Sequence, residues 1–191
     1  MSISVFSIVQ YCHFLIPYLL KEGRVVVDAT CGNGHDSLFL CNLMQGKGFL
    51  YSFDVQESAL SHAKHRIEKG CPYSNYKLIN DSHDKIHYYI DESISLAVYN
   101  LGYLPGGNPN LTTKPETTIA SLRIILNRLE KGGYVLIAAY IGHDNGQERD
   151  YLYHFLKSLD SSEYRVANHR IINIDNYPPE LFIIKKMHAT K

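Results

Sequence analysis

The sequence predicts an α/β fold in which helices cover both faces of an open, mostly parallel, seven-stranded sheet with an antiparallel edge. Three observations lead to this prediction. Short apolar runs alternate with segments of helical periodicity along the chain. The first apolar run leads directly into a glycine-rich turn, and several other runs end at an acidic or amide residue. The length of 191 residues suits one domain, so we expect residues 1–191 to form a single unit.

The first half of the chain shows the alternation most clearly. Apolar residues recur at helical spacing within residues 1–22, and Gly23 supplies a stop, so we expect an N-terminal helix that packs on the domain. The run Val25-Val26-Val27 is typical of a buried strand. The other strands expected here cover residues 48–55, 76–79 and 94–99, and the helices cover residues 35–44 and 57–69.

The second half continues the pattern and then departs from it. Gly132 and Gly133 are expected to close a helix, and the final two strand candidates have no convincing helix between them. A turn-like Asn-Tyr-Pro-Pro segment separates those two strands, which predicts an antiparallel hairpin at the sheet edge. The expected helices cover residues 116–130 and 147–159, and the expected strands cover residues 134–141, 164–174 and 180–185.

The composition excludes several classes of protein. Lys and Arg total 19, as do Asp and Glu, so the net charge is zero and the chain lacks the strongly basic character of nonspecific nucleic-acid binders. Any nucleic-acid partner must therefore be recognised by a local surface. Apolar residues make up 45% of the chain, which excludes a mainly disordered protein.

The cysteines and the N-terminal segment bear on the cellular compartment. The four cysteines, which form no CxxC pair, are Cys12, Cys31, Cys41 and Cys71. We therefore expect no disulfide framework and no zinc or other metal site. This cysteine usage fits a reducing cytoplasm as the location. The uncharged residues 1–20 lack a basic start and a cleavage site, and polar residues and Pro17 interrupt them. We therefore expect a packed helix there and no membrane contact.

Polar side chains stand at the ends of four predicted strands. Parallel strands place their carboxyl ends at one edge of the sheet, where ligands bind in such folds; the residues concerned are Asp28, Asp54, Asp81 and Asn100. The turn after Asp28 contains Gly32 and Gly34, and Asp54 lies 20 residues past Gly34, the usual distance for a carboxylate that binds ribose hydroxyls. This spacing indicates an adenosine-containing cofactor.

The details favour S-adenosylmethionine over a nicotinamide dinucleotide. A dinucleotide fingerprint needs a third glycine near position 37, where the chain has Ser37, and it does not ordinarily place an acid before the loop. Asp28 suits the cationic amine of the methionine portion instead. Structural alternatives stay open: Asp36 can serve as a first-turn helix acid, and Asp81 can serve only as a helix cap.

A second motif follows the strand that ends at Asn100. Residues 100–107 read NLGYLPGG, and a strand-end Asn followed by a small and an aromatic residue is similar to the loop of nitrogen-directed methyltransferases. Neutral acceptors orient the N–H bonds of an amine and spread the charge that grows as the amine attacks a sulfonium methyl. After the next strand, His143 is a candidate proton acceptor. The alternatives are a plain Pro-Gly-Gly loop and a structural histidine.

Together, residues 28–37 (DATCGNGHDS), 100–107 (NLGYLPGG) and 140–143 (YIGH) resemble the YtqB-type rRNA methylase family over nearly the whole chain. The first motif is common to class I methyltransferases, whereas the second is specific to this family. The resemblance implies a Rossmann-like class I methyltransferase fold. It also implies methyl transfer from S-adenosylmethionine to the aminomethyl nitrogen of 5-aminomethyl-2-thiouridine at the tRNA wobble position, giving 5-methylaminomethyl-2-thiouridine.

The site expected on this basis has a cofactor part and an acceptor part. The predicted cofactor-binding residues are Asp28, Gly32, Asn33, Gly34, Asp36, Ser37, Asp54, Gln56, Asp81 and Ser82, and the predicted catalytic residues are Asn100, Tyr103 and His143. The expected partner is the anticodon stem-loop of tRNA, and a homodimer would merge two modest basic patches. The alternatives are a same-fold N-methyltransferase acting on rRNA, a small metabolite or a protein amine, and a noncatalytic binding module.

Overall fold

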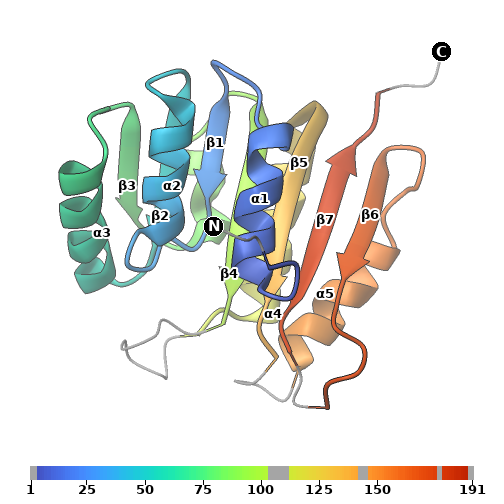
Figure 1. Ribbon diagram of the computed structural model, residues 1–191. Helices are drawn as coiled ribbons and strands as arrows, with labels where there is room; N and C mark the ends of the chain where they lie inside the picture. The colour runs from blue at the N-terminus through green and yellow to red at the C-terminus, as the bar shows by residue number, and fades with distance from the viewer. Residues whose placement is uncertain (1–3, 103–111, 142–145, 176–177, 189–191) are drawn as a thin grey trace.

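The computed structural model describes residues 4–102, 112–141, 146–175 and 178–188 and confirms the predicted α/β fold (Figure 1). Seven strands form one sheet in the order β3-β2-β1-β4-β5-β7-β6. Strands β1 to β5 run parallel, whereas β7 is antiparallel to both β5 and β6. The strands are β1 (Val25–Asp28), β2 (Phe49–Asp54), β3 (Tyr76–Asn80), β4 (Ile94–Leu101), β5 (Leu129–Ala139), β6 (Tyr164–His169) and β7 (Glu180–Lys186).

Helices cover both faces of the sheet. On one face lie α1 (Ile8–Leu19), α2 (His35–Met44) and α3 (Glu57–Gly70), and on the other lie α4 (Pro115–Arg128) and α5 (Gln147–Lys157), together with the 3-10 helix η1 (His83–Tyr88) (Figure 1). The central strand β4 serves both cores, because successive side chains of a strand point to opposite faces. Leu96 and Val98 join the core beneath α1 and α2, while Ala97 and Tyr99 join the core beneath α4.

Two predicted boundaries are wrong, and the sheet explains the first. Gly132 and Gly133 do not close a helix, because α4 ends at Arg128 and β5 begins at the next residue. Leu129 already pairs with Ile94, and a register shift separates that pair from the regular ladder. A Cβ atom at Gly133 would lie 2.9 Å from the Ser95 carbonyl oxygen, so this close approach of the strands requires glycine. The second error is β6, which ends at His169 rather than near residue 174.

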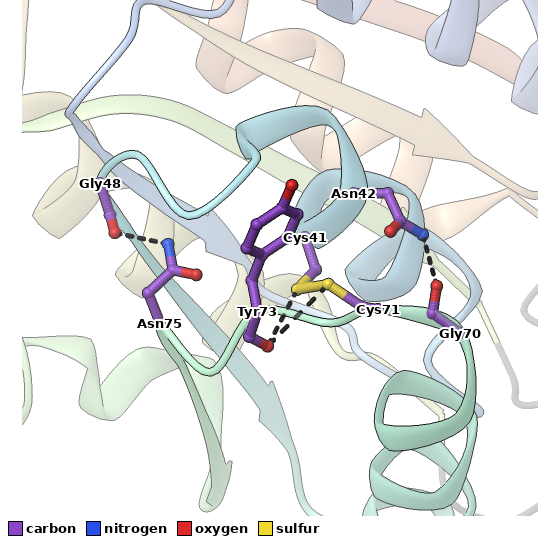
Figure 2. Close-up of a disulfide and its surroundings, with 7 residues drawn as sticks. All are labelled: Cys41, Asn42, Gly48, Gly70, Cys71, Tyr73 and Asn75. Carbon is purple, nitrogen blue, oxygen red and sulfur yellow. Dashed lines mark hydrogen bonds between the residues drawn. A yellow bond between two sulfur atoms is a disulfide. The ribbon is translucent and has the colours of Figure 1, made fainter.

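The sequence predicts no disulfide framework, and the structure contains one disulfide that the cysteine spacing did not reveal. Cys41, near the end of α2, is joined by a disulfide to Cys71, the residue that follows α3 (Figure 2). The sequence separation of 30 residues carries no sign of this contact, because only the packing of α2 against α3 brings the two thiols together. The Asn42 amide donates to the Gly70 carbonyl at 3.1 Å beside it. Cys12 and Cys31 are free and buried.

The N-terminal segment agrees with the expected packed helix. α1 is 12 residues long and buries Ile8, Cys12 and Ile16 against the sheet, and the Ser7 hydroxyl caps its first turn by accepting from the Gln10 N–H. None of the helices in the described parts of the chain combines the length and apolar character needed to cross a bilayer.

Candidate functional site

A cavity of about 740 Å³ opens at the carboxyl ends of the parallel strands. Its walls come from the residues after β1, β2 and β3, the end of β4, Tyr140 after β5, residues 112–114 and Thr117 of α4. This volume lies within the range of small-molecule and cofactor sites. The topology therefore brings three of the four predicted strand-end residues, Asp54, Asp81 and Asn100, to the wall of one cavity.

The glycine-rich turn is held from two sides. The Gly32 N–H donates to Asp54 Oδ2 at 2.8 Å, which ties the loop after β1 to the end of β2. Gly34 has a φ of 79°, and a Cβ atom there would lie 2.6 Å from both Cα and Cβ of Ala63 on α3. Gly34 is thus required for helix packing, whereas Gly32 lies in the cavity wall.

Asp54 lies in the cavity wall with a carboxylate held by backbone N–H groups. Its Oδ1 accepts from the Gln56 N–H at 2.8 Å and its Oδ2 accepts from Gly32. Burial raises the pKa of Asp54, and these N–H bonds oppose that rise by favouring the ionised form. Gln56, which also lines the cavity, is the N-cap residue of α3. This end of the site offers fixed acceptors to a diol.

Asp28 and Ser37 lie beneath the turn, and neither is among the described residues that line the cavity. Asp28 is fully buried; its Oδ2 accepts from the Ser37 hydroxyl at 2.6 Å and its Oδ1 from the Thr30 N–H at 3.2 Å. Burial raises the pKa of Asp28 to about 7, and the charge of nearby Asp36 adds to the rise. Asp28 therefore shapes the loop from within.

The predicted residues after β3 also reach the cavity. Asp81 Oδ1 accepts from the Ser82 N–H, and Oδ2 accepts from the Tyr89 hydroxyl, both at 2.8 Å. Asp81 and Ser82 line the cavity just before η1, and Ser82 is the N-cap residue of η1 without a side-chain cap bond. Asn33 also lines the cavity, and its backbone carbonyl accepts from Arg66 Nε at 2.8 Å.

Asn100, near the end of β4, also lines the cavity and is held by two hydrogen bonds. Its backbone N–H donates to the Thr30 hydroxyl at 2.6 Å, and its side-chain amide nitrogen donates to Asp36 Oδ2. The other oxygen of Asp36 lies 2.7 Å from His13 Nε2 on α1. The other predicted catalytic residues, Tyr103 and His143, lie outside the described residues.

The sequence analysis missed a second network, which flanks Asn100. The Gly102 N–H donates to the Thr113 hydroxyl at 2.9 Å, and the Thr113 N–H donates to the Gly102 carbonyl at 3.1 Å. Glu148, buried in the first turn of α5, accepts from the hydroxyls of Thr113 at 2.6 Å and Thr118 at 2.7 Å. No local pattern marks these residues, because three separate segments come together only in the fold.

His83 is a further residue that lines the cavity. Its side chain is 8% exposed, and its Nδ1 has no hydrogen-bond partner within the described parts of the chain. Burial lowers the pKa of His83 to about 4, so its ring is neutral at pH 7. An apolar wall formed in part by Phe53 and Val55 lies in the same cavity. This side of the cavity therefore suits a neutral, flat ring.

The chain matches a family model, and it has a curated relative over most of its length. Residues 50–185 match the model of the "Putative rRNA methylase" family. The relative is a protein of Arabidopsis thaliana named "tRNA (mnm(5)s(2)U34)-methyltransferase, chloroplastic". It is 29% identical over 192 residues, which cover 93% of this chain and 69% of the relative.

Solved structures resemble the chain over nearly its full length. The "putative rRNA-methylase" of Clostridium thermocellum is 35% identical with a TM-score of 0.91, covering 98% of this chain and 100% of that one. A "putative methyltransferase" of Streptococcus mutans, solved in complex with SAH, is 36% identical with a TM-score of 0.86. That match covers 95% of this chain and 98% of the other. Because each match covers at least 95% of this chain, the likeness extends over the sheet and both helical layers.

Proposed function

The chain belongs to the "Putative rRNA methylase" family of methyltransferases that use S-adenosylmethionine, and we propose that its substrate is a modified uridine of tRNA. The proposed reaction converts 5-aminomethyl-2-thiouridine at the wobble position into 5-methylaminomethyl-2-thiouridine. The named substrate of the Arabidopsis relative supports the RNA and the position. The observation that carries the proposal is Asn100 at the cavity, with its amide nitrogen bonded to Asp36.

The residues of the cavity suit S-adenosylmethionine. In the proposal, Asp54 and Gln56 bind the ribose hydroxyls, and Asp81 and Ser82 bind the adenine beside the apolar wall. The methionine portion lies against the turn after β1, where the proposed partners are Asp28, Gly32, Asn33, Gly34, Asp36 and Ser37. Of these, Asp28, Gly34 and Ser37 act from behind the wall by holding the turn. The bound cofactor supplies an electrophilic methyl group on a sulfonium sulfur.

The acceptor part of the proposal rests on Asn100. An amine attacks only through its lone pair, so its N–H bonds need acceptors that leave the lone pair directed at the methyl group. The Asn100 amide oxygen is such an acceptor, because the amide nitrogen already donates to Asp36. Tyr103 and His143 complete the proposed acceptor site, with His143 taking the proton that the amine loses.

The proposed partner is the anticodon stem-loop, and the proposed compartment is the cytoplasm, where a homodimer would join two modest basic patches into one RNA surface. The zero net charge agrees with recognition by a local surface rather than by the whole molecule. In that compartment, thiol couples favour reduction of the Cys41–Cys71 disulfide.

Nucleoside mass spectrometry tests the proposed function. The purified chain is incubated with S-adenosylmethionine and with tRNA that carries 5-aminomethyl-2-thiouridine, and matched tRNA with unmodified uridine at that position is the control. We expect the mass of one added methyl group on the modified nucleoside only. If the chain binds S-adenosylmethionine but neither tRNA gains a methyl group, the tRNA proposal is wrong and the acceptor is another amine.

A further inference from the structure

Three side chains that lie far apart in the sequence form one line of hydrogen bonds that ends at Asn100 in the cavity wall. His13 comes from α1, Asp36 from the first turn of α2 and Asn100 from the end of β4. His13 Nε2 lies 2.7 Å from Asp36 Oδ1, and the Asn100 amide nitrogen donates to Asp36 Oδ2. The carboxylate of Asp36 therefore has a partner on each oxygen.

This line determines which way the Asn100 amide faces. An ionised carboxylate only accepts hydrogen bonds, so the amide group that meets Asp36 is the NH₂ group and the amide oxygen points elsewhere. The Asn100 backbone is held as well, because its N–H donates to the Thr30 hydroxyl at 2.6 Å. Both the position and the orientation of the acceptor oxygen are thereby defined before any substrate arrives.

His13 holds the other end of the line. Its ring lies parallel to the ring of Phe39, with a centroid distance of 4.1 Å and an interplanar angle of 2°. The stacked ring directs Nε2 at Asp36, and the carboxylate favours the ring form that carries a hydrogen on Nε2. Without this donor, Asp36 loses one partner and can rotate away from Asn100.

We propose that His13 is a positioning residue of the methyltransferase, which acts through Asp36 to keep the Asn100 amide oxygen directed at the target amine. This inference rests on the proposed function, since it assumes that Asn100 receives an amine. It assigns to Asp36 the orientation of Asn100 and to the N-terminal helix a part in the acceptor site. His13 itself is not among the described residues that line the cavity.

Two substitutions separate the donor of His13 from its ring. His13→Phe keeps the ring that stacks on Phe39 and removes the donor, whereas His13→Gln removes the ring and keeps an N–H donor. His87→Phe is the matched control, because His87 also lies beside an aromatic ring, at 4.0 Å from Tyr88, but on the exposed surface of η1. Thermal unfolding of each variant checks that the fold is retained.

The kinetic test compares kcat, the KM for tRNA and the Kd for S-adenosylmethionine. We expect His13→Phe to lower kcat about tenfold, as loss of one charge-assisted hydrogen bond would. The cofactor Kd should change by no more than about threefold, since Asp36 keeps its bond to Asn100 in part and the other proposed cofactor partners are untouched. His13→Gln should restore kcat to within about threefold of the wild type. A wild-type kcat in His13→Phe would overturn the inference, as would His13→Gln being no better than His13→Phe.

A second readout keeps the inference separate from the proposed function. The side-chain amide resonances of Asn100, identified by their loss in Asn100→Ala, report the bond to Asp36 in ¹⁵N-labelled protein without any substrate. We expect these resonances to shift in His13→Phe and to stay in place in His13→Gln and His87→Phe. If the wild type fails to methylate the tRNA, the proposed function fails, and unshifted Asn100 resonances in His13→Phe would overturn the positioning role independently.

Discussion

The two sides of the cavity are built from contacts of different range. On the cofactor side, formed by the residues after β1, β2 and β3, each strand end binds its own or the adjacent loop. Asp54 accepts from Gln56 two residues on and from Gly32 in the loop after the neighbouring strand β1, and Asp81 accepts from Ser82. These contacts follow from the local motif and the parallel order of the strands.

On the acceptor side, formed by the end of β4, residues 112–118 and the start of α5, the contacts join distant segments. Asn100 depends on Asp36, and Gly102 depends on Thr113, which Glu148 holds in turn. The comparison teaches that the cofactor side can be read from motifs, whereas the acceptor side depends on how three or four segments meet. Substitutions on the two sides should therefore affect different steps.

The largest expected effect on cofactor affinity is on the cofactor side. Asp54→Ala removes the acceptor of the Gly32 N–H and the proposed partner of the ribose, so we expect S-adenosylmethionine to bind about 100-fold more weakly. Isothermal titration calorimetry measures this. Glu68→Gln, an exposed change on α3, is the control. An unchanged Kd in Asp54→Ala would remove Asp54 from the cofactor site.

The disulfide should sharpen the comparison, because it joins α2 and α3, the helices that follow β1 and β2, but lies outside the cavity wall. The double variant Cys41→Ala, Cys71→Ala opens a loop with a sequence separation of 30 residues and should lower the free energy of unfolding by about 3 kcal/mol. Urea unfolding of the oxidised wild type and the variant measures the loss. We expect the Kd for S-adenosylmethionine to stay the same; a parallel loss of affinity would mean that the disulfide shapes the site.

A smaller effect is expected on the acceptor side. Glu148→Gln replaces a carboxylate that accepts from two threonine hydroxyls, which should loosen Gly102 and lower kcat by about tenfold. Cofactor affinity should stay within about twofold of the wild type, because Glu148 does not line the cavity. Single-turnover kinetics and calorimetry on the same preparation check both statements. Loss of cofactor affinity in this variant would break the division between the two sides.

The smallest effect concerns pH. Burial raises the pKa of Asp28 to about 7, above its ordinary value of 3.8, so the folded state holds this proton more tightly than the unfolded state. The stability that this proton gives is complete below about pH 4 and is lost as the pH rises through about 7. Denaturant unfolding of the cofactor-free protein should therefore show the wild type losing stability relative to Asp28→Asn between pH 5 and pH 8, on the order of 1 kcal/mol or more. A constant difference would contradict the raised pKa.

The sequence predicted most of the fold because continuous apolar runs mark strands that are buried on both faces, and helical spacing marks the helices between them. It also placed Asp54, Asp81 and Asn100 at one edge, since parallel strands end together. It did not predict the pairing of Cys41 with Cys71, and it gave Gly132 and Gly133 to a helix end. Those features depend on how α2 packs on α3 and on a shift of register in β5, and neither leaves a periodic signal.

The site was predicted less completely than the fold, for the same reason. A polar residue at the end of a strand can be recognised in the sequence. His13 and Glu148 act on residues of the cavity wall from helices, where no local pattern distinguishes them from other polar residues. Asp28 is easily recognised from its position in the motif, but in the structure it is buried and bonded to Ser37 and Thr30 rather than exposed in the cavity wall. Motif position thus indicates the neighbourhood of a residue and leaves its contacts to be determined.

The most direct test of the two-sided account is the rate of methyl transfer by Asn100→Ala in a single turnover. The assay uses saturating S-adenosylmethionine and tRNA carrying 5-aminomethyl-2-thiouridine, and calorimetry on the same variant gives the cofactor affinity. The account predicts a Kd for the cofactor within about threefold of the wild type and a rate of methyl transfer lowered by about 100-fold or more, because an acceptor of the amine hydrogens is lost. A wild-type rate would contradict the role of Asn100, and a lost cofactor affinity would contradict the separation of the two sides.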